Sequence, residues 1–149
     1  MAQPHRHNIN KLITAEIVLG VCCLVCGCAI YLLFRSKSLN IYQWCDAIGM
    51  TSFIDALRNC VQRWYVADFV KFCLPDGLYS AAYILFMDAI WHNDSGILKY
   101  FVISFVPCVA IGSELLQYFG LVKGTFDIYD LVCYSVPLIL YYIINNKHK

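Results

Sequence analysis

The chain has 149 residues, of which 60% are hydrophobic and 14% are charged, and its formal net charge at pH 7 is +1. Soluble domains have about 45–50% apolar and about 25% charged residues, so this composition excludes an ordinary soluble domain. The near-neutral charge excludes a basic face for nucleic acid. We therefore expect one transmembrane domain over residues 1–149, with the lipid bilayer as its main partner and no nucleic acid.

Four apolar segments predict an all-α membrane protein, a bundle of about four transmembrane helices. The first segment is residues 12–34, and Glu16 is its only charged residue. At about 1.5 Å per residue that segment would rise roughly 34 Å, enough for a hydrocarbon core of about 30 Å. The apolar run is too long for the core of a cleaved signal peptide, so we expect it to be retained. The four predicted spans are 12–34, 74–91, 97–119 and 126–144.

Between the first two predicted spans, residues 51–71 have the pattern of an amphipathic helix. Its apolar side chains recur at helical spacing, and polar side chains take the opposite side. Aromatic residues of the kind that settle at headgroup depth accompany it. We interpret it as an interfacial lid over one end of the bundle, with partner binding or a re-entrant element as alternatives. The apolar side is Phe53, Leu57, Val61 and Trp64, and the polar side is Asp55, Arg58, Asn59, Gln62 and Arg63.

Nine cysteines raise the question of a metal site. Cys22, Cys23, Cys26 and Cys28 lie inside the first predicted span, with no histidine or second cysteine pair nearby, and structural zinc needs a closed shell of four ligands. We read them as small apolar residues in helix contacts, and expect no metal and no cofactor. Cys45 and Cys60 lie in the polar loop, and a disulfide between them is an alternative if the loop faces an oxidising compartment.

Ionisable residues inside the spans are informative, because a charge in lipid is costly and usually faces the bundle interior. In an up-and-down bundle, the start of the second span, the end of the third and the start of the fourth meet at one end. The residues expected there, here called the acidic mouth, are Asp76, Glu114, Gln117, Asp127 and Asp130. Possible counter-charges on the same side are Lys123, Arg58, Arg63 and Lys71.

Crowded carboxylates in a partly desolvated mouth should have raised pKa values. The structural alternative is that Asp127 only caps its helix and that the other members only hydrogen-bond neighbouring helices. At the opposite end, Glu16, Asp88 and His92 are interpreted as interface-level residues, and Lys99 is placed to extend its ammonium group to the interface.

Residues 112–119 (GSELLQYF) followed by 124–131 (GTFDIYDL) resemble VanZ-like membrane proteins. In that family a Glu-x-x-Gln ends one helix and a Phe-Asp-x-x-Asp opens the next, and 74–76 (LPD) resembles its earlier Pro-Asp motif. The chain differs in having Lys123 where an arginine is usual, and Cys133-Tyr134 where an asparagine and a glycine are common.

The resemblance implies a protein of the bacterial cytoplasmic membrane, with both termini in the cytoplasm, acting on or near a lipid or amphiphile. An antibiotic-resistance-type role fits it. The arginine and lysine residues divide almost evenly between the two sides, so charge bias alone does not orient the chain.

Three classes of function follow. The leading hypothesis is a non-catalytic protein that binds, or protects against, a lipid-linked or amphiphilic molecule. The alternatives are a membrane enzyme using the carboxylates as acid and base and a proton-coupled transporter. A transporter of this size would need a homo-oligomer to enclose a pathway.

Overall fold

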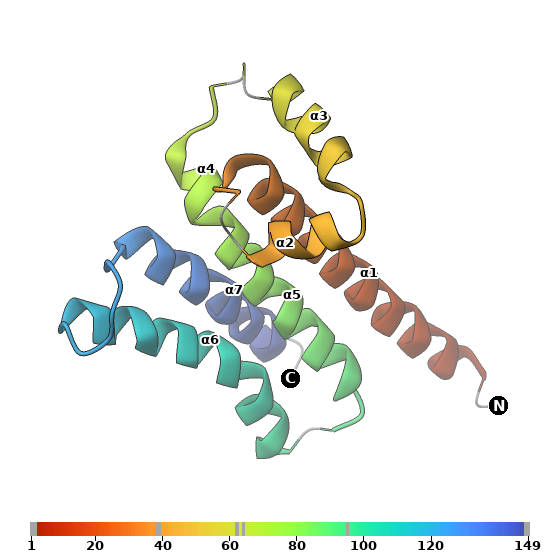
Figure 1. Cartoon of the computed structure of the whole chain (residues 1–149). Coiled ribbons are helices and arrows are strands. Elements are labelled where there is room, and N and C mark those ends of the chain that lie inside the picture. Colours follow the sequence, from red (N-terminus) through yellow and green to blue (C-terminus); the bar gives the residue numbers. More distant parts are fainter. Residues whose placement is uncertain (1–2, 38–39, 62, 64, 95, 148–149) are drawn as a thin grey trace.

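The computed structural model describes residues 3–37, 40–61, 63, 65–94 and 96–147, and these form seven helices and no strand (Figure 1). The fold class is therefore all-α, as the sequence predicts. In chain order the helices are α1 (Gln3–Phe34), α2 (Asn40–Ala47), α3 (Thr51–Val61), α4 (Asp68–Phe72), α5 (Leu74–Ile90), α6 (Ile97–Tyr118) and α7 (Ile128–Lys147).

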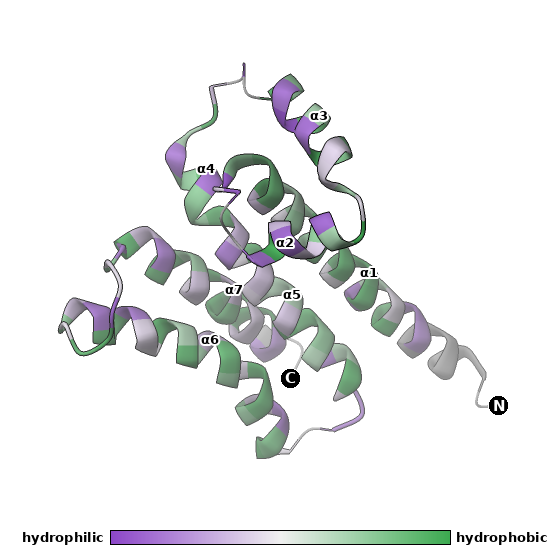
Figure 2. Cartoon of the chain, viewed as in Figure 1, coloured by the Kyte–Doolittle hydropathy of each residue, from purple (hydrophilic) through white to green (hydrophobic). Residues whose placement is uncertain are grey.

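Three helices in the described part of the chain are long and apolar enough to cross a membrane: Asn10–Phe34, Ile97–Tyr118 and Ile128–Asn146. Large apolar side chains on each of them face outward, including Val18, Phe105 and Ile139, which are 55%, 53% and 54% exposed. Such surface suits lipid rather than water. Figure 2 shows the contrast between the apolar ribbons of these helices and the more polar α3.

The prediction of four full-length spans is wrong, because α5, which joins the two ends of the bundle, has only 17 residues. It rises about 25 Å, less than the roughly 30 Å of the hydrocarbon core. The helix cannot lengthen at its start, where Cys73 separates it from α4 and Pro75 occupies its first turn. It nevertheless runs between the two ends of the bundle, enclosed by α1, α6 and α7.

Small residues allow α1 and α5 to pack closely. A side chain at Gly20 would begin 2.8 Å from the Phe86 ring, and one at Gly27 would begin 3.0 Å from the Tyr79 ring. The absence of a Cβ atom at these points lets the two backbones approach. Because residue numbers rise on α1 as they fall on α5, the two helices are antiparallel.

The other contacts of α5 fix the order of the bundle. The Ser80 hydroxyl lies 3.4 Å from the carbonyl oxygen of Tyr134, and Gly77 packs on Cys133, so α5 and α7 are parallel. The Tyr83 hydroxyl donates to the Val102 carbonyl of α6 at 2.7 Å. The end of α1, the start of α5, the end of α6 and the start of α7 therefore share one end of the bundle.

The predicted helix over 51–71 is wrong in extent, because α3 ends at Val61 and α4 begins at Asp68. Two of its expected residues, Gln62 and Trp64, lie outside the described residues. Phe53 and Leu57 of the apolar side are exposed, and their place in the membrane interface stays a prediction.

Arg58, which is expected on the polar side of this helix, turns toward the end of α1. Its guanidinium group donates to the carbonyl oxygens of Leu32 and Arg35, at 2.9 and 2.8 Å. The Tyr42 hydroxyl also donates to the Leu32 carbonyl. The last carbonyls of a helix have no partner within it, so these contacts satisfy the end of α1. Cys45 and Cys60 both have free thiols in this structure.

Candidate functional site at one end of the bundle

Glu114 connects α6 to the start of α7. It is buried, at 7% exposure, on the last turns of α6. One carboxylate oxygen accepts the backbone N–H of Asp127 at 3.4 Å, and the other lies 3.5 Å from the amide nitrogen of Gln117. Glu114 and Gln117 therefore share one face of α6, as their spacing predicts, and that face meets the turn into α7.

Asp127 is the N-cap of α7. Its side chain accepts the backbone N–H of Tyr129 at 2.8 Å, and its carbonyl accepts the N–H of Leu131 at 3.2 Å. A carboxylate in this position satisfies a free amide and interacts favourably with the helix dipole. The structural interpretation of Asp127 as a cap is confirmed.

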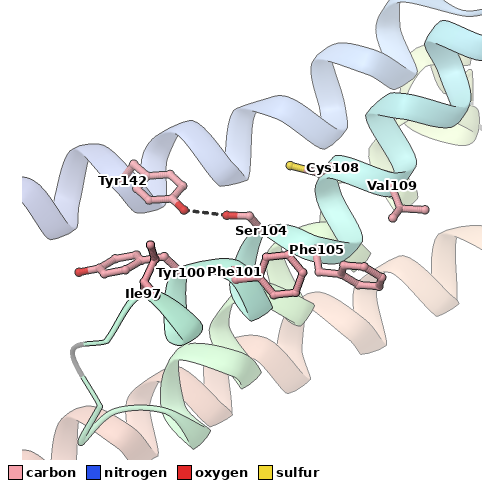
Figure 3. A pocket seen from close by; sticks show the side chains of 8 residues that line it. All are labelled: Ile97, Tyr100, Phe101, Ser104, Phe105, Cys108, Val109 and Tyr142. Atoms are coloured by element: carbon pink, nitrogen blue, oxygen red, sulfur yellow. Dashed lines mark hydrogen bonds between the residues drawn. The ribbon is translucent and has the colours of Figure 1, made fainter.

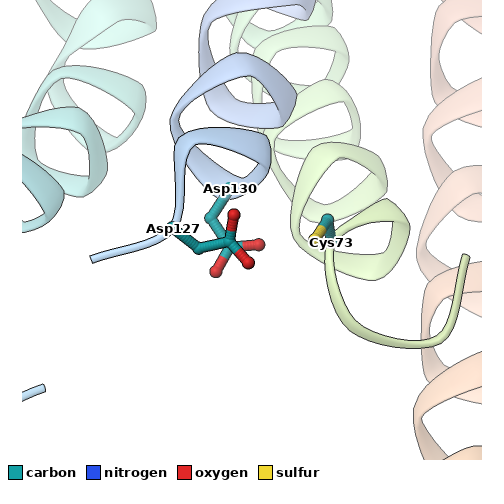
Figure 4. A group of neighbouring side chains, drawn as sticks. All are labelled: Cys73, Asp127 and Asp130. Atoms are coloured by element: carbon teal, nitrogen blue, oxygen red, sulfur yellow. The ribbon is translucent and has the colours of Figure 1, made fainter. Parts of the chain in front are cut away.

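Asp130 and Cys73 adjoin this cap (Figure 4). The ligand atoms of Cys73, Asp127 and Asp130 all lie within 4.8 Å of one another. Burial raises the pKa of the Cys73 thiol to about 12, helped by its hydrogen bond to the Asp130 carboxyl group and by that group's charge. A thiol with such a pKa stays protonated near neutral pH and is a weak nucleophile.

Asp76, in the first turn of α5, completes the acidic mouth. Burial raises the pKa of Asp76 to about 6, and the Asp130 carboxylate adds to the effect. The Arg35 guanidinium opposes it. Four carboxyl groups from α5, α6 and the start of α7 thus lie at one end of the bundle, where the sequence places them.

The four expected counter-charges do not pair with these acids in the described part of the chain. Lys71 pairs with Asp68 at 3.2 Å, and Arg58 donates to the carbonyl oxygens of Leu32 and Arg35 at the end of α1. Lys123 and Arg63 are exposed to solvent.

The charge of Arg35 acts on Asp76 at this end of the bundle. Its guanidinium donates to the Phe72 carbonyl at 3.1 Å and lies 5.0 Å from the centre of the Phe72 ring. This role of Arg35 is not among the predictions made from the sequence. The antiparallel register of α1 and α5, which brings the end of α1 beside α4, is the signal that could have found it.

Chemically, the acidic mouth can bind a cation or a hydrogen-bond donor and exchange protons. Cys73, Asp127 and Asp130 together offer one sulfur and two oxygen ligands. That is three of the four ligands that zinc usually takes, and the raised pKa of the thiol opposes the thiolate that a metal requires.

A second polar cluster lies at the opposite end of the bundle. Lys99 is buried, at 8% exposure, and its ammonium group pairs with Asp88 at 2.6 Å. The prediction that Lys99 extends to the interface is therefore wrong, because the nearest compensating carboxylate lies inside the bundle. The Tyr141 hydroxyl donates to Asp88 at 3.0 Å and accepts from Asn145 at 2.9 Å.

Asp88 was interpreted as an interface-level residue, and its place in this buried pair was missed. Glu16 and His92, interpreted in the same way, line a cavity of about 700 Å³ beside it. Asp88 and Lys99 flank the short turn between α5 and α6, which is the sequence signal for their pairing.

A third feature is an apolar hollow on α6, beside α7 (Figure 3). Its volume is about 500 Å³, and a hydrogen bond of 2.7 Å between Ser104 and Tyr142 lies at its edge. Phe101 and Phe105, which line it, are exposed on the surface that α6 would present to lipid.

No protein-family model, no curated protein and no solved structure matches this chain.

Proposed function

We propose that the protein is a non-catalytic protein of the bacterial cytoplasmic membrane whose acidic mouth binds the polar part of a lipid or amphiphilic molecule. The observation that carries the proposal is the convergence of Asp76, Glu114, Asp127 and Asp130 at one end of the bundle. Carboxyl groups gathered at membrane depth usually mark a site for an ion, a proton or a ligand.

The environment of the mouth favours a ligand of mixed character. Arg35 is the one cation among the causes that shift the pKa of Asp76 in the described part of the chain, so a cationic or hydrogen-bond-donating ligand would relieve the repulsion between the carboxyl groups. Exposed apolar side chains on the adjoining turn, such as Phe119 and Leu121, are 68% and 72% exposed and could hold an alkyl chain near it. Phe53 and Leu57 of α3 would lie in the membrane interface at the same end.

The resemblance to VanZ-like proteins supports the same proposal. Its two motifs contribute Glu114, Gln117, Asp127 and Asp130, and these residues meet at the turn between α6 and α7. On this proposal both termini are cytoplasmic, the mouth opens outside, and protection against an amphiphilic antibiotic is the physiological role. The weakly nucleophilic thiol of Cys73 argues against an enzyme that uses it covalently.

Identification of the co-purifying amphiphile tests the proposal. Full-length protein is purified in a maltoside detergent, and the amphiphiles released by organic solvent are identified by mass spectrometry. We expect one class of amphiphile to be enriched with the wild type. Asp130→Asn removes a charged acceptor, and loss of one charge-assisted hydrogen bond of roughly 1.5–3 kcal/mol would lower retention about tenfold or more.

Asp68→Asn is the matched control, because it removes an exposed carboxylate at the same end of the bundle that pairs only with Lys71. It should retain as much amphiphile as the wild type. Equal loss in both variants, or no enriched amphiphile in any of them, would contradict the proposal.

A proton-coupled transporter is the second candidate. The observation that favours it is the presence of ionisable groups at both ends of α5, with Asp76 at the start and the Asp88–Lys99 pair near the end. A pH gradient across proteoliposomes that drives solute flux would favour this function over static binding. Since one chain is too small to enclose a pathway, flux should then accompany a homo-oligomer.

A further inference from the structure

The cavity at the end opposite the acidic mouth is bounded by α1, α5 and α7, with Lys99 of α6 reaching into it. Its volume of about 700 Å³ is in the range of small-molecule sites, which are commonly about 300–1,000 Å³. Most of its wall is aliphatic. The aliphatic side chains are Leu12, Ala81, Ile84, Leu85, Leu140 and Ile144.

The polar groups of this cavity are unequally satisfied. Asp88 already has two partners, the Lys99 ammonium at 2.6 Å and the Tyr141 hydroxyl at 3.0 Å. Glu16 has one carboxylate oxygen that is shielded from solvent and has no hydrogen-bond partner within the described residues. A shielded oxygen atom without a hydrogen-bond partner is costly, so a ligand that donates to this oxygen would gain the interaction that the protein leaves unmade.

The charge of the lining sets the sign of that ligand. The lining holds two acidic side chains, Glu16 and Asp88, against the ammonium group of Lys99. A primary ammonium group bound beside Glu16 would donate to its free oxygen and stabilise the charged form of the carboxyl group. A carboxylate or phosphate at the same place would face two acidic side chains.

We propose that this cavity binds an amphiphile with a primary ammonium group, with the nitrogen paired to Glu16 and the alkyl chain against the aliphatic wall. This site lies at the other end of the bundle from the acidic mouth and does not depend on the function proposed above. The ammonium can belong to a free alkylamine or to the headgroup of an ethanolamine phospholipid.

Two spin-labelled probes distinguish the two sources. A spin-labelled stearylamine and a spin-labelled phosphatidylethanolamine are titrated into full-length protein in maltoside micelles, and the immobilised fraction is followed by electron paramagnetic resonance. A spin-labelled stearyl alcohol measures binding by the chain alone. We expect at least one amine probe to bind about tenfold or more tightly than the alcohol, as a charge-assisted hydrogen bond would give.

Glu16→Gln tests the role of the carboxylate. It keeps the size of the side chain and should bring amine binding down to the level of the alcohol, with alcohol binding unchanged. Asp94→Asn is the matched control, because Asp94 is an exposed carboxylate at the same end of the bundle and an asparagine can keep its hydrogen bond to Gly96. It should bind the amine as the wild type does.

Ala81→Leu tests the cavity itself, since it fills space beside the aliphatic wall and should weaken amine and alcohol binding together. Equal binding of amines and alcohol by the wild type would overturn the proposal. An equal loss in Glu16→Gln and Asp94→Asn would also overturn it, because attraction to general surface charge would then explain the binding. If stearylamine alone, or phosphatidylethanolamine alone, shows the Glu16-dependent preference, that result supports the proposal and identifies the source.

Discussion

At the scale of single residues, some contacts at the ends of the bundle are set by local helical geometry and others by the packing of distant helices. The i, i+3 spacing of Glu114 with Gln117 fixes a shared helix face, because helical geometry is local. The ion pair of Lys99 depends on how α6 packs against α5. The hydrogen bonds of Arg58 depend on where α3 lies against α1. Such pairings are set by tertiary packing, which spacing along one segment does not encode.

The raised pKa of Asp76 predicts a pH-dependent stability. Its pKa of about 6 lies above the usual 3.8, so the folded state disfavours the charged form. Both states are protonated below about pH 3. As pH rises between the two pKa values, the folded protein holds the proton more tightly than the unfolded chain, and this group lowers stability progressively until about pH 6.

Asp76→Asn removes that penalty. Its Tm should exceed that of the wild type at pH 7.5 and equal it at about pH 3, as followed by thermal denaturation in detergent. Glu114 cannot serve as the control, because it also accepts the backbone N–H of Asp127. Asp94→Asn, in an exposed turn, should give no pH-dependent difference. A lower Tm of Asp76→Asn at pH 7.5 would show that the charged form is stabilising.

The cap of α7 predicts a cost in stability for one substitution and little cost for another. Asp127→Ala removes the acceptor for the Tyr129 N–H and should cost about 0.5–2 kcal/mol of unfolding free energy. Asparagine caps helices as well as aspartate does, because its side-chain oxygen also accepts a hydrogen bond. The unfolding free energy of Asp127→Asn should therefore be close to that of the wild type. Equilibrium unfolding in mixed micelles measures both, and an equal cost would mean that the charge, and not the cap, is what α7 requires.

At the scale of elements, apolar runs predicted α1, α6 and α7 well, because a helix long enough to span lipid has a clear signature in sequence. The segment over 51–71 was misjudged, since helical periodicity alone does not show where a helix stops. The described residues between α3 and α4 include Tyr65, which is 99% exposed. Nothing in the apolar spacing marks that interruption.

The contact of Arg58 with the end of α1 predicts that α3 stabilises α1. Arg58→Ala should leave the carbonyls of Leu32 and Arg35 short of donors and cost about 1–3 kcal/mol. Arg63→Ala, at an exposed position, should change stability by less than about 0.5 kcal/mol. Urea or mixed-micelle titration of both variants measures the difference. Equal costs would show that the Arg58 contacts contribute nothing to stability.

The close approach of α1 and α5 predicts a contrast between two glycines. Gly20→Leu places a large side chain where the Phe86 ring lies 2.8 Å away and should cost about 1–3 kcal/mol. Gly112→Leu, on α6, meets nothing within 4 Å and should be neutral or stabilising because glycine is a poor helix former. If Gly20→Leu is tolerated as well as Gly112→Leu, the α1–α5 interface is looser than the structure indicates.

At the scale of the whole molecule, the sequence predicted the end-to-end order of the helices but overestimated the number of independent spans. The acids of the mouth meet at one end of the bundle because successive helices run in opposite directions. Although α5 is short, it still runs from one end of the bundle to the other and keeps this alternation. The cavity at the opposite end could not be foreseen, because it arises from how three helices and a buried ion pair leave space between them.

The arrangement predicts that residues near both termini lie on one side of the membrane, since Leu12 and Asn145 line the same cavity. Reporter fusions after residue 8 and after residue 147 should therefore report the same compartment, and a reporter inserted beside Lys123 should report the other. Opposite signals from the two ends would show that α5 does not return the chain across the bilayer.

The shortness of α5 has an electrical consequence. Asp76 and Asp88 lie at its two ends and are separated by a rise of about 18 Å along the helix, much less than the roughly 30 Å of hydrocarbon around the bundle. Each end carries groups that attract water, so the insulating layer is thinnest along this axis. Along this axis the same membrane potential would fall over a shorter distance, so the electric field on charges near the two ends of α5 would be stronger than elsewhere in the bundle.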